Sequence, residues 1–560
     1  MRNVKNLFGM AVMATALVAC SSNDDLTSNG HEGNQTGEAY ASFRINLPTT
    51  TGTRADDPKP GTPSFDGGTA KEYEVKNGTI LIFDATTEKF VTSANLGTMN
   101  PWTDVKTNGV TTSAIATVKL ENVKVGGNYK ALVLLNNNVD ATTEKVKLPT
   151  DAETYAAWSK DVDKVDAEKY VSTDGIFMAN APKYESAKED PTTLVKINHV
   201  CASPEEAQAK AATVVYVERG LAKVTMKDFT TGGYPIGDGT YAGAKVEIKN
   251  WQLDVTNKST FPVHQTAGLN SWSEIWNTPR FYDGTNATFK RVYWGVDPNY
   301  DKATYQTLEN CKTAFNMIKK ENVVGLAGVA NPQYCLENTF DLNNMKQGQT
   351  TRVVFKAVFT PKGITTGETF YKIGNNTAIW TEERLKQQIK TVALTAMGIT
   401  NADEQGKYGV DLTKGTNISG KAGQHLVEAA NITYSGDAAS SKVTGEVVNT
   451  INEKLGLSAE VGISTYLNGE AYYIARIKHF NELTHWNAGE AYGTDNGKYL
   501  GRYGVLRNNW YDLSVTSVSG LGYPDVPEVK PELPDDENDQ YINVEVKILD
   551  WAKRSQSIDL

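Results

Sequence analysis

The chain has 560 residues, a formal net charge of −10 and 39% hydrophobic residues. At about 100 to 200 residues per domain this length suggests three domains, although two large β-sandwiches with insertions would also account for it. The negative charge argues against a nucleic-acid partner. Plentiful Thr, Tyr, Val and Gly without long heptads favour a mostly β protein.

The N-terminus has the features of an exported protein. Arg2 and Lys5 precede an apolar stretch, residues 7–18, which is too short to remain as a membrane span. Leu17-Val18-Ala19-Cys20 resembles the lipobox of bacterial lipoproteins, in which Cys20 becomes the lipidated first residue; an ordinary cleaved signal with an incidental cysteine is the alternative. Residues 21–38 are rich in Ser, Asn, Gly and Glu, which predicts a disordered tether.

A first strand is predicted directly after this tether. Its apolar residues alternate with polar ones, and they are Ala41, Phe43, Ile45 and Leu47. Residues 49–61 carry several Gly and Pro and no apolar anchor, as exposed loops that proteases cut do. Arg54 is the only basic residue between Arg44 and Lys59. One cut between Arg54 and Ala55 by an arginine-specific protease would therefore detach the first strand from the rest of the chain.

The middle of the chain predicts two sandwiches with helical insertions. Strands of the first are expected at residues 79–83, 113–120, 129–135 and 175–178. The second is expected to begin near Val214, with strands at Val215, Val217, Leu221, Val224 and residues 246–248, 353–359 and 472–477. Helices are expected at residues 151–170, after the capping box that begins at Ser203, and at residues 381–397 and 438–455.

The chain ends in a second alternating strand. Its apolar residues are Ile542, Val544, Val546 and Ile548, and Trp551 follows. Residues 521–540 before it contain four prolines among acidic residues, which predicts an extended, mobile tether of about 3.1 Å per residue. We therefore expect the last strand to be free to pair with another molecule.

The search for chemistry finds only near matches. Residues 415–422 have P-loop spacing, but an alanine replaces the Ser or Thr that would hold magnesium. Residues 297–301 begin like a calcium loop, yet Lys302 stands where glycine is needed. His479 and His485 lack both the spacing of a zinc-protease helix and a third ligand. We predict no catalytic residue, no metal site, no cofactor and no enzyme activity.

Cysteines and aromatic residues leave two questions open. With Cys20 lipidated, three cysteines remain, and Cys311 and Cys335 could pair or stay as buried thiols. Aromatic residues could line a glycan-binding platform, although in β-sandwiches they more often belong to the core. The tryptophans in question are Trp251, Trp272, Trp276, Trp294, Trp486 and Trp510. A glycan-binding outer-membrane surface lipoprotein is therefore the alternative function.

Several motifs, in their order, resemble those of the type V fimbrial shaft (major) subunits, and specifically the short-fimbria branch of these lipoprotein-precursor pilins. Besides the lipobox and the cleavage segment, they lie at residues 127–136, 177–179, 217–224, 291–294, 334–340 and 503–511 and in the closing strand. No single motif is decisive. The resemblance rests on their order along nearly the whole chain.

The resemblance implies a fold and a maturation route. The fold is mostly β, with two transthyretin-like β-sandwich domains that carry helical insertions and are completed between subunits by donor-strand exchange. A gingipain-type protease would cut after Arg54. The implied parts are a lipoprotein signal peptide (1–20), a propeptide with the leader strand (21–54), the N-terminal (55–213) and C-terminal (214–520) sandwiches, a tether (521–540) and the donor strand (541–560).

This interpretation makes the chain a structural subunit that supports cell adhesion, biofilm formation and virulence. Its expected partners are copies of itself, anchor and tip fimbrial subunits and the arginine-specific protease. The precursor is also expected to be anchored transiently in the outer membrane through a palmitate on Cys20. The mature protein is expected in a cell-surface fimbria. An anchor subunit would keep its leader and a tip subunit would lack a free C-terminal strand, so the presence of both features favours the shaft.

Overall fold

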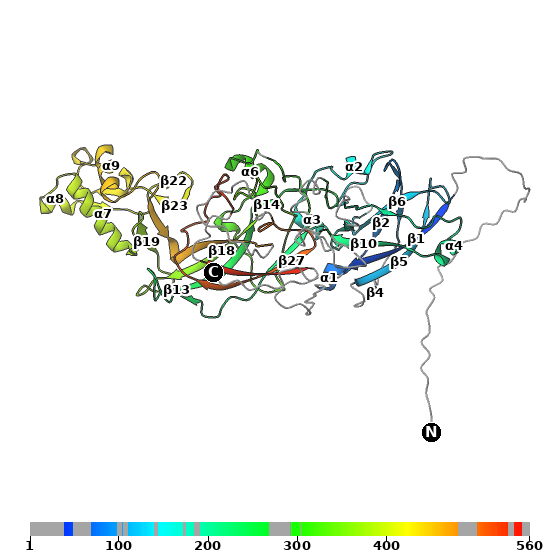
Figure 1. The fold of residues 1–560 in the computed structure, drawn as a ribbon. Helices are drawn as coiled ribbons and strands as arrows, with labels where there is room; N and C mark the ends of the chain where they lie inside the picture. Colours follow the sequence, from blue (N-terminus) through cyan, green and yellow to red (C-terminus); the bar gives the residue numbers. More distant parts are fainter. Residues whose placement is uncertain are drawn as a thin grey trace, which may run out of the picture. The chain divides into compact units, whose positions relative to one another are not determined.

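The computed structural model describes residues 38–48, 69–97, 103–104, 110–138, 144–171, 175–183, 191–267, 292, 294–302, 304–479, 501–535 and 542–550. They belong to one compact unit that begins at Gly37. Strands dominate this unit (Figure 1), which confirms the mostly β prediction. Within the described residues, no helix is both long and apolar enough to cross a membrane.

The first sheet has nine strands and holds the N-terminal core. Its order is β3-β2-β6-β8-β10-β1-β5-β4, and β9 pairs with β6. The strands are β1 (Ala39–Pro48), β2 (Gly78–Asp84), β3 (Phe90–Asn95), β4 (Thr103–Asp104), β5 (Val110–Leu120), β6 (Tyr129–Leu135), β8 (Met178–Asn180), β9 (Val195–Lys196) and β10 (Thr213–Arg219). Apolar residues from both ends of this path share one core, so the sheet folds over itself as a sandwich.

Short helices accompany this sheet. They are α1 (Ala70–Tyr73), α2 (Tyr155–Trp158), α3 (Ala167–Tyr170) and α4 (Pro204–Ala209). The predicted capping box is formed in part: the Ser203 hydroxyl accepts a hydrogen bond from the Glu206 N–H at the start of α4, but the Glu206 carboxylate accepts from the Ala202 N–H. The helical stretch expected over residues 151–170 forms only α2 and α3, with β7 (Asp163–Lys164) between them.

Two four-stranded sheets form the second sandwich. One has the order β17-β11-β27-β28, and the other β12-β13-β18-β26. The strands are β11 (Ala222–Met226), β12 (Tyr234–Pro235), β13 (Lys245–Asp254), β17 (Gln333–Cys335), β18 (Arg352–Thr360), β26 (Glu470–Arg476), β27 (Asn509–Val518) and β28 (Ile542–Asp550). Trp251, Phe355 and Tyr511 lie fully buried in their shared core.

Smaller elements connect the two sandwiches. The strand β14 (Thr256–Asn257) pairs with β16 (Phe315–Asn316), and β15 (Ser259–Thr260) pairs with β7 of the first half. The helix α6 (Leu308–Ala314) packs its Cys311 and Ala314 into a small separate core.

The insertion in the second sandwich is a lobe with its own core. A sheet of order β20-β19-β25-β23-β22 packs with α7 (Glu382–Ala396) and α9 (Gly445–Lys454) around Leu385, Ile389 and Ile451. Its other elements are β19 (Phe370–Ile373), β20 (Trp380–Thr381), β21 (Tyr408–Val410), β22 (Asn417–Ile418), β23 (Lys421–His425), β24 (Ile432–Tyr434), β25 (Ile463–Tyr466) and α8 (Ala402–Gly406). Both helices expected here are present, although α9 begins later than predicted, after a 3₁₀ turn at Ala438–Ser440.

The first sandwich extends further along the chain than predicted. The strand β10 pairs with β1 and β8, and Val215 and Val217 lie in the first core, so the boundary drawn between residues 213 and 214 is wrong. Sequence could not show this, because the apolar alternation of β10 continues into β11. The chain passes from the first sandwich to the second at Gly220, between β10 and β11. A β-carbon at this position would lie 2.7 Å from the ring of Phe177, which is too close for any residue other than glycine unless the ring moves.

Residues 521–535 pack against the body and do not form the mobile tether that was predicted. Leu521, Val526 and Val529 are buried. Tyr523 exchanges two backbone hydrogen bonds of 2.7 and 2.8 Å with Tyr472. Each proline lacks a backbone N–H donor but keeps its carbonyl acceptor. An extended proline-rich segment can therefore still be held by hydrogen bonds to its carbonyl oxygens.

The end of this packed segment is anchored at Asp535. Its buried carboxylate accepts a 3.1 Å hydrogen bond from the Thr350 hydroxyl, and its N–H donates to the Met345 carbonyl at 3.2 Å. Residues 536–541, outside the described residues, connect it to β28. A link of this length spans at most about 20 Å when fully extended, which is far less than the predicted tether would reach.

Replacing Arg352 by Met should destabilise the protein and loosen residues 521–535. The Arg352 Nε and Nη2 atoms each lie 2.8 Å from the buried Asp254 carboxylate, and Nη2 donates to the Pro527 carbonyl at 2.7 Å. Removing one partner of a buried pair costs about 3 to 5 kcal/mol. Urea unfolding measures the loss, and limited proteolysis measures the exposure of the segment around Pro527.

The matched control is Lys407→Met, which breaks the exposed pair between Lys407 and Glu404. This variant should unfold like the original protein, because exposed pairs contribute little. An Arg352→Met protein as stable and as protease-resistant as this control would contradict the prediction.

Candidate strand-exchange site

The strand β1 occupies an interior position in the first sheet. It runs antiparallel to β5, with Cα pairs from Ala39↔Leu120 to Pro48↔Val110, and parallel to β10, from Phe43↔Thr213 to Asn46↔Tyr216. Figure 1 shows β1 between these two strands. We call this position the slot. Both edges of β1 are hydrogen-bonded, so its removal would leave two strands with unpaired edges.

One face of β1 lies in the N-terminal core. Its inward residues are at most 2% exposed, and they are the four predicted residues Ala41, Phe43, Ile45 and Leu47 together with Ala39. They pack with apolar residues of β2, β5, β6 and β10. The expected strand is therefore present, and the structure brings its alternating residues into one core.

The opposite face of β1 is polar, and α4 covers part of it. Ser42 donates its hydroxyl to the Ala207 carbonyl of α4 at 2.9 Å and lies 2.8 Å from the Thr117 hydroxyl. Arg44 is exposed and has Ile115 and Val214 as its cross-strand neighbours. These positions of the slot therefore differ, since Ser42 is enclosed by a helix and Arg44 faces solvent.

We call the end of the slot at Glu38 the mouth. The Glu38 carboxylate pairs with the Lys119 ammonium and accepts a hydrogen bond from the Tyr40 hydroxyl at 3.4 Å. Tyr40 also exchanges two backbone hydrogen bonds, of 2.9 and 2.8 Å, with Cys201. An acidic residue and a tyrosine two positions later therefore fix the entry of β1 into the slot.

The first described residues after β1 are anchored separately from it. Glu72 of α1 lies buried 2.6 Å from the Lys223 ammonium of β11 and accepts a 2.8 Å hydrogen bond from the Tyr334 hydroxyl. Burial alone would raise the pKa of Glu72, but the Lys223 charge and the hydrogen bonds outweigh it and lower this pKa. Lys223 also lies 3.7 Å from the Trp510 ring centroid. The chain downstream of residues 49–68 is thus held to the second sandwich.

The predicted cleavage and lipid sites, Arg54, Ala55 and Cys20, lie outside the described residues. The C-terminal strand is described as β28, which pairs with β27 and with no other strand of the described residues, and Trp551 after it is outside them. The Cα register of β28 runs from Asn509↔Asp550 to Val518↔Ile542. The predicted residues Ile542, Val544, Val546 and Ile548 therefore lie in an edge strand of their own chain.

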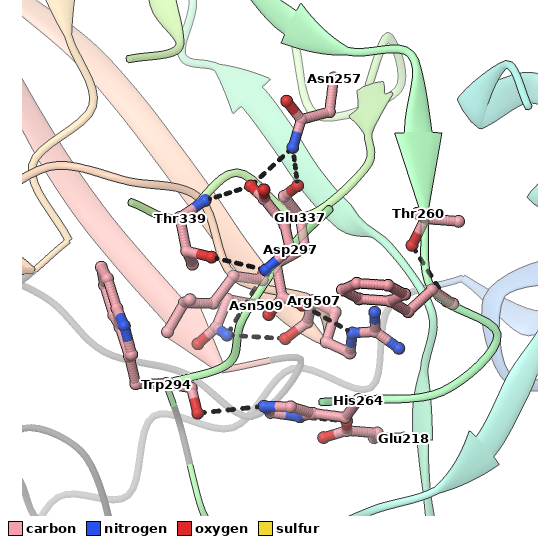
Figure 2. A network of polar contacts seen from close by, with 12 residues as sticks. Glu218, Asn257, Thr260, His264, Trp294, Asp297, Glu337, Thr339, Arg507 and Asn509 are labelled. Carbon is pink, nitrogen blue, oxygen red and sulfur yellow. Dashed lines mark hydrogen bonds and ion pairs between the residues drawn. The ribbon is translucent and has the colours of Figure 1, made fainter. Parts of the chain in front are cut away.

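A buried polar network joins the two sandwiches (Figure 2). His264 lies at one side of it, with Nδ1 2.7 Å from the Glu218 carboxylate of β10 and Nε2 3.1 Å from the Trp294 carbonyl. Both partners are hydrogen-bond acceptors. Nearby, the Glu337 carboxylate lies 3.1 Å from the Arg507 Nε.

Asp297 holds the other side of this network. Its carboxylate accepts hydrogen bonds of 2.7, 2.7 and 2.6 Å from Asn257, the Thr339 N–H and the Asn299 N–H. Burial raises the pKa of Asp297 to about 7, although these donors favour its charged form. The stretch that begins like a calcium loop is therefore a turn in which protein donors hold the Asp297 carboxylate.

Four motifs that lie far apart in sequence meet at this junction. Glu218, Trp294, Glu337 and Arg507 come from residues 217–224, 291–294, 334–340 and 503–511. Sequence analysis found the motifs but not their common place. It missed Glu72 and Lys223 as anchors, because a buried ion pair between distant segments leaves no local pattern.

The other near matches have structural roles where they are described. Residues 415–422 include β22 and the start of β23, a hairpin with no helix after it, so they lack P-loop architecture. His479 is buried 2.6 Å from the Tyr511 hydroxyl. Among the described residues, no group of three or more His, Cys, Asp or Glu side chains is placed to hold a metal.

Cys201, Cys311 and Cys335 are buried free thiols, which answers the open question of a Cys311–Cys335 pair. Burial raises the pKa of Cys311 to about 11 and that of Cys335 to about 12, so both stay protonated. Three of the tryptophans considered for a glycan platform are also buried, and they are Trp251, Trp294 and Trp510.

Replacing Phe43 by Ala should destabilise the uncut chain by about 3 to 5 kcal/mol, because it leaves a cavity in the N-terminal core. Denaturant unfolding of the uncut protein measures the loss. Arg44→Ala is the matched control, since Arg44 is exposed on the same strand. Equal unfolding midpoints for the two variants would contradict the packing of β1 described above.

Comparisons with known proteins point to fimbriae. Residues 464–557, which contain β26, β27 and β28, match the family model described as the major fimbrial subunit protein type IV, fimbrillin, C-terminal. No curated protein matches the chain.

Three solved structures are similar over part or most of the chain. A putative cell adhesion protein from Parabacteroides distasonis ATCC 8503 aligns over 92% of this chain and 99% of its own, with 12% identity and a TM-score of 0.36. The tip fimbrial protein Mfa3 from Porphyromonas gingivalis, with a C-terminal truncation, aligns over 91% and 100%, with 11% identity and a TM-score of 0.29. A fimbrial assembly protein from Parabacteroides distasonis ATCC 8503 aligns over 41% and 67%, with 14% identity and a TM-score of 0.23.

Alignments at these TM-scores are too loose to assign a role. The family model is independent of them, and it covers the strands that close the second sandwich. It confirms the fimbrial resemblance found in the sequence motifs. The C-terminal region of this chain is therefore similar to the C-terminal part of the fimbrillin family of major fimbrial subunits.

Proposed function

We propose that the chain is a shaft subunit of a cell-surface fimbria and polymerises by protease-triggered strand exchange. The observation that carries this proposal is the interior position of β1, which lies upstream of Arg54 in the sequence. An edge strand could leave a sheet with little effect. An interior strand leaves a gap between two strands, and only another strand can fill it.

Cleavage changes how strongly β1 is held. In the uncut chain, residues 49–68 keep β1 at high effective concentration beside its slot. After a cut at Arg54, β1 is a separate segment that can dissociate. Glu72 remains fixed by Lys223 and Tyr334, so the cut frees the strand without loosening the rest of the first sandwich.

The emptied slot would favour a new strand. It offers the edges of β5 and β10 and an apolar floor, which is the arrangement that β-augmentation uses. Burying Ile542, Val544, Val546 and Ile548 at about 1.5 to 3 kcal/mol each gives a gross gain of about 6 to 12 kcal/mol before ordering costs. The leader strand offers three large apolar residues, Phe43, Ile45 and Leu47, so the exchange is downhill once the leader can leave.

The donor strand is held more weakly where it starts. Among the described strands β28 pairs only with β27, whereas the slot provides a neighbour on each side. The anchor at Asp535 limits the reach of the strand, so the slot of the next subunit must open close to Asp535 of the donor. Such a contact joins two different surfaces and does not close on itself, and repeating it builds a filament.

The remaining features of this role follow from the same parts. Cys20 would carry the lipid that holds the precursor at the outer membrane, and the lipid would leave with the leader after the cut. Anchor and tip subunits would end the filament, and the assembled fimbria would support adhesion and biofilm formation. The alternative, a glycan-binding lipoprotein, has less support, since Trp251, Trp294 and Trp510 are buried.

Arg54→Ala should abolish polymerisation triggered by an arginine-specific protease, because β1 stays covalently attached. Unboiled samples on a denaturing gel should show a ladder of multimers for the original protein and only monomer for the variant. Arg44→Ala is the control, since it removes an arginine of β1 and leaves Arg54 in place. A ladder from the Arg54→Ala protein that matches the original would contradict cleavage as the trigger.

Deleting residues 541–560 should leave a folded monomer that is cut but forms no multimers, because β27 keeps β11 as a partner and only the donor strand is lost. Deleting residues 552–560 is the matched control, because it keeps β28 and Trp551. Far-ultraviolet circular dichroism checks folding, and the same gel checks assembly. Multimers from the longer deletion would rule out β28 as the donor.

A further inference from the structure

We propose that the donor strand enters the slot in the direction and register of β1, so that Tyr541 takes the place of Tyr40 and Ile548 that of Leu47. This inference rests on the proposed function, since it assumes that the strand of a second copy fills the slot. It adds the contacts that the strand makes there. Three features of the slot carry it: the core face, the site under α4 and the mouth.

The core face allows one alignment of the apolar residues. The inward positions of Ala41, Phe43, Ile45 and Leu47 are at most 2% exposed and need four alternating apolar side chains. Ile542, Val544, Val546 and Ile548 supply them. A shift by one residue would put Asn, Glu and Lys in the core, and a shift by two would put either Asp550 or both Asn538 and Gln540 there, whereas the proposed register places one neutral amide, Gln540, at the Ala39 position. Burying such groups without partners is costly.

The site under α4 distinguishes the two directions that this alignment permits. In the direction of β1, Asn543 replaces Ser42; in the opposite direction, Lys547 does. Ser42 is 7% exposed and bonds to the Ala207 carbonyl and the Thr117 hydroxyl. An asparagine amide can donate to both of these oxygens. A lysine ammonium would be buried under the helix without a carboxylate partner, which is costly.

Lys547 fits better at the other end of the slot. In the direction of β1 it takes the place of Asn46, which is as buried as Ser42, at 6% exposed, but lies two residues from the end of the strand at Pro48 and is not covered by α4 in the way that Ser42 is. There its long stem can follow the strand toward solvent with its charged end outside. Asn46 accepts a hydrogen bond from the Ser113 hydroxyl, and this hydroxyl can turn to leave space for the stem.

The mouth supports the same direction. Glu38 pairs with Lys119, and Tyr40 pairs with the backbone of Cys201. In the direction of β1, Asp539 takes the place of Glu38 and Tyr541 that of Tyr40, so an acid again faces Lys119 and a tyrosine follows it. The opposite direction would bring Trp551 and Leu549 to these positions, which leaves Lys119 without a carboxylate from the strand.

The position of Ala39 gives a further distinction. Ala39 is fully buried at the start of β1. In the direction of β1 its place is taken by Gln540, and in the opposite direction by Asp550. A neutral amide costs less to bury than a carboxylate. The direction of β1 is thus the one that places no charged residue on the core face.

This direction has a consequence for the order of assembly. The donor strand would enter at the mouth, and the leader of the acceptor leaves the slot through the same mouth on its way back to Cys20. Both segments cannot occupy this entry together. The leader of each subunit must therefore clear the mouth before the next donor strand can seat fully.

Disulfide trapping between subunits tests the register. The full-length precursor carries two new cysteines in a Cys201→Ser background, because Cys201 lies at the mouth, and it is cut and then oxidised. Direct cross-strand partners lie close enough for a disulfide. Ser42 stands opposite Thr117 and Asn46 opposite Ser113. After boiling, which separates multimers held only by strand exchange, N543C with T117C should give a ladder on a non-reducing denaturing gel that collapses on reduction, and N543C with S113C should give none.

A third pair separates this inference from the proposed function. Position 545 lies at the centre of the alignment and faces Ile115, the partner of Arg44, in either direction. E545C with I115C should therefore give the ladder whenever the strand occupies the slot. A ladder from this pair and from N543C with S113C, but not from N543C with T117C, would overturn the direction. No ladder from any of the three pairs, in protein that is fully cut, would overturn strand exchange itself.

Discussion

The hydrogen bonds along both edges of β1 are the constraint on which the rest of the structure depends. A strand in the interior of a sheet is an obligatory part of its core, and in this chain that part is encoded ahead of a loop with a single arginine between Arg44 and Lys59. The first sandwich is thus complete only while it holds a strand that can be separated from it. An edge position for β1 would create less of this dependence, because its loss would cost one hydrogen-bond ladder and open no gap between two strands.

The body of the protein is built so that the loss of β1 stays local. Glu72 is fixed to Lys223, and Arg219 donates its Nε to the Glu72 carbonyl at 2.8 Å and its Nη1 to the Asn508 side chain at 3.3 Å. The network around His264 and Asp297 joins the sandwiches a second time (Figure 2). Buried charges of this kind add little net stability but penalise any other arrangement of their segments. They therefore favour one relative position of the two sandwiches at the junction.

Local features of the fold were predictable from sequence, and long-range ones were not. The alternation in Ala41 to Leu47 predicts a strand, and the Ser203 capping box predicts the start of α4, because each depends on neighbouring residues. Nothing in residues 39–48 shows that the partners are β5 and β10. The prolines of residues 521–535 suggested mobility, yet their carbonyls and the apolar Val526 and Val529 hold the segment in place. For the candidate site, the sequence predicted the two strands. It did not predict the anchors at Glu72 and Asp535, which hold the neighbouring segments in place.

The short link after Asp535 changes what kind of polymer strand exchange would build. A mobile tether of twenty residues would let a donor strand reach slots at many distances and angles. The relative orientation of neighbouring subunits would then be almost unconstrained. A link of six residues, which begins at a buried carboxylate, restricts the acceptor to within about 20 Å of Asp535. The strand itself is held by two ladders and a core once seated. With so few residues between Asp535 and the seated strand, the contact that joins two subunits would also limit their relative orientation, and a stiff shaft would follow from it.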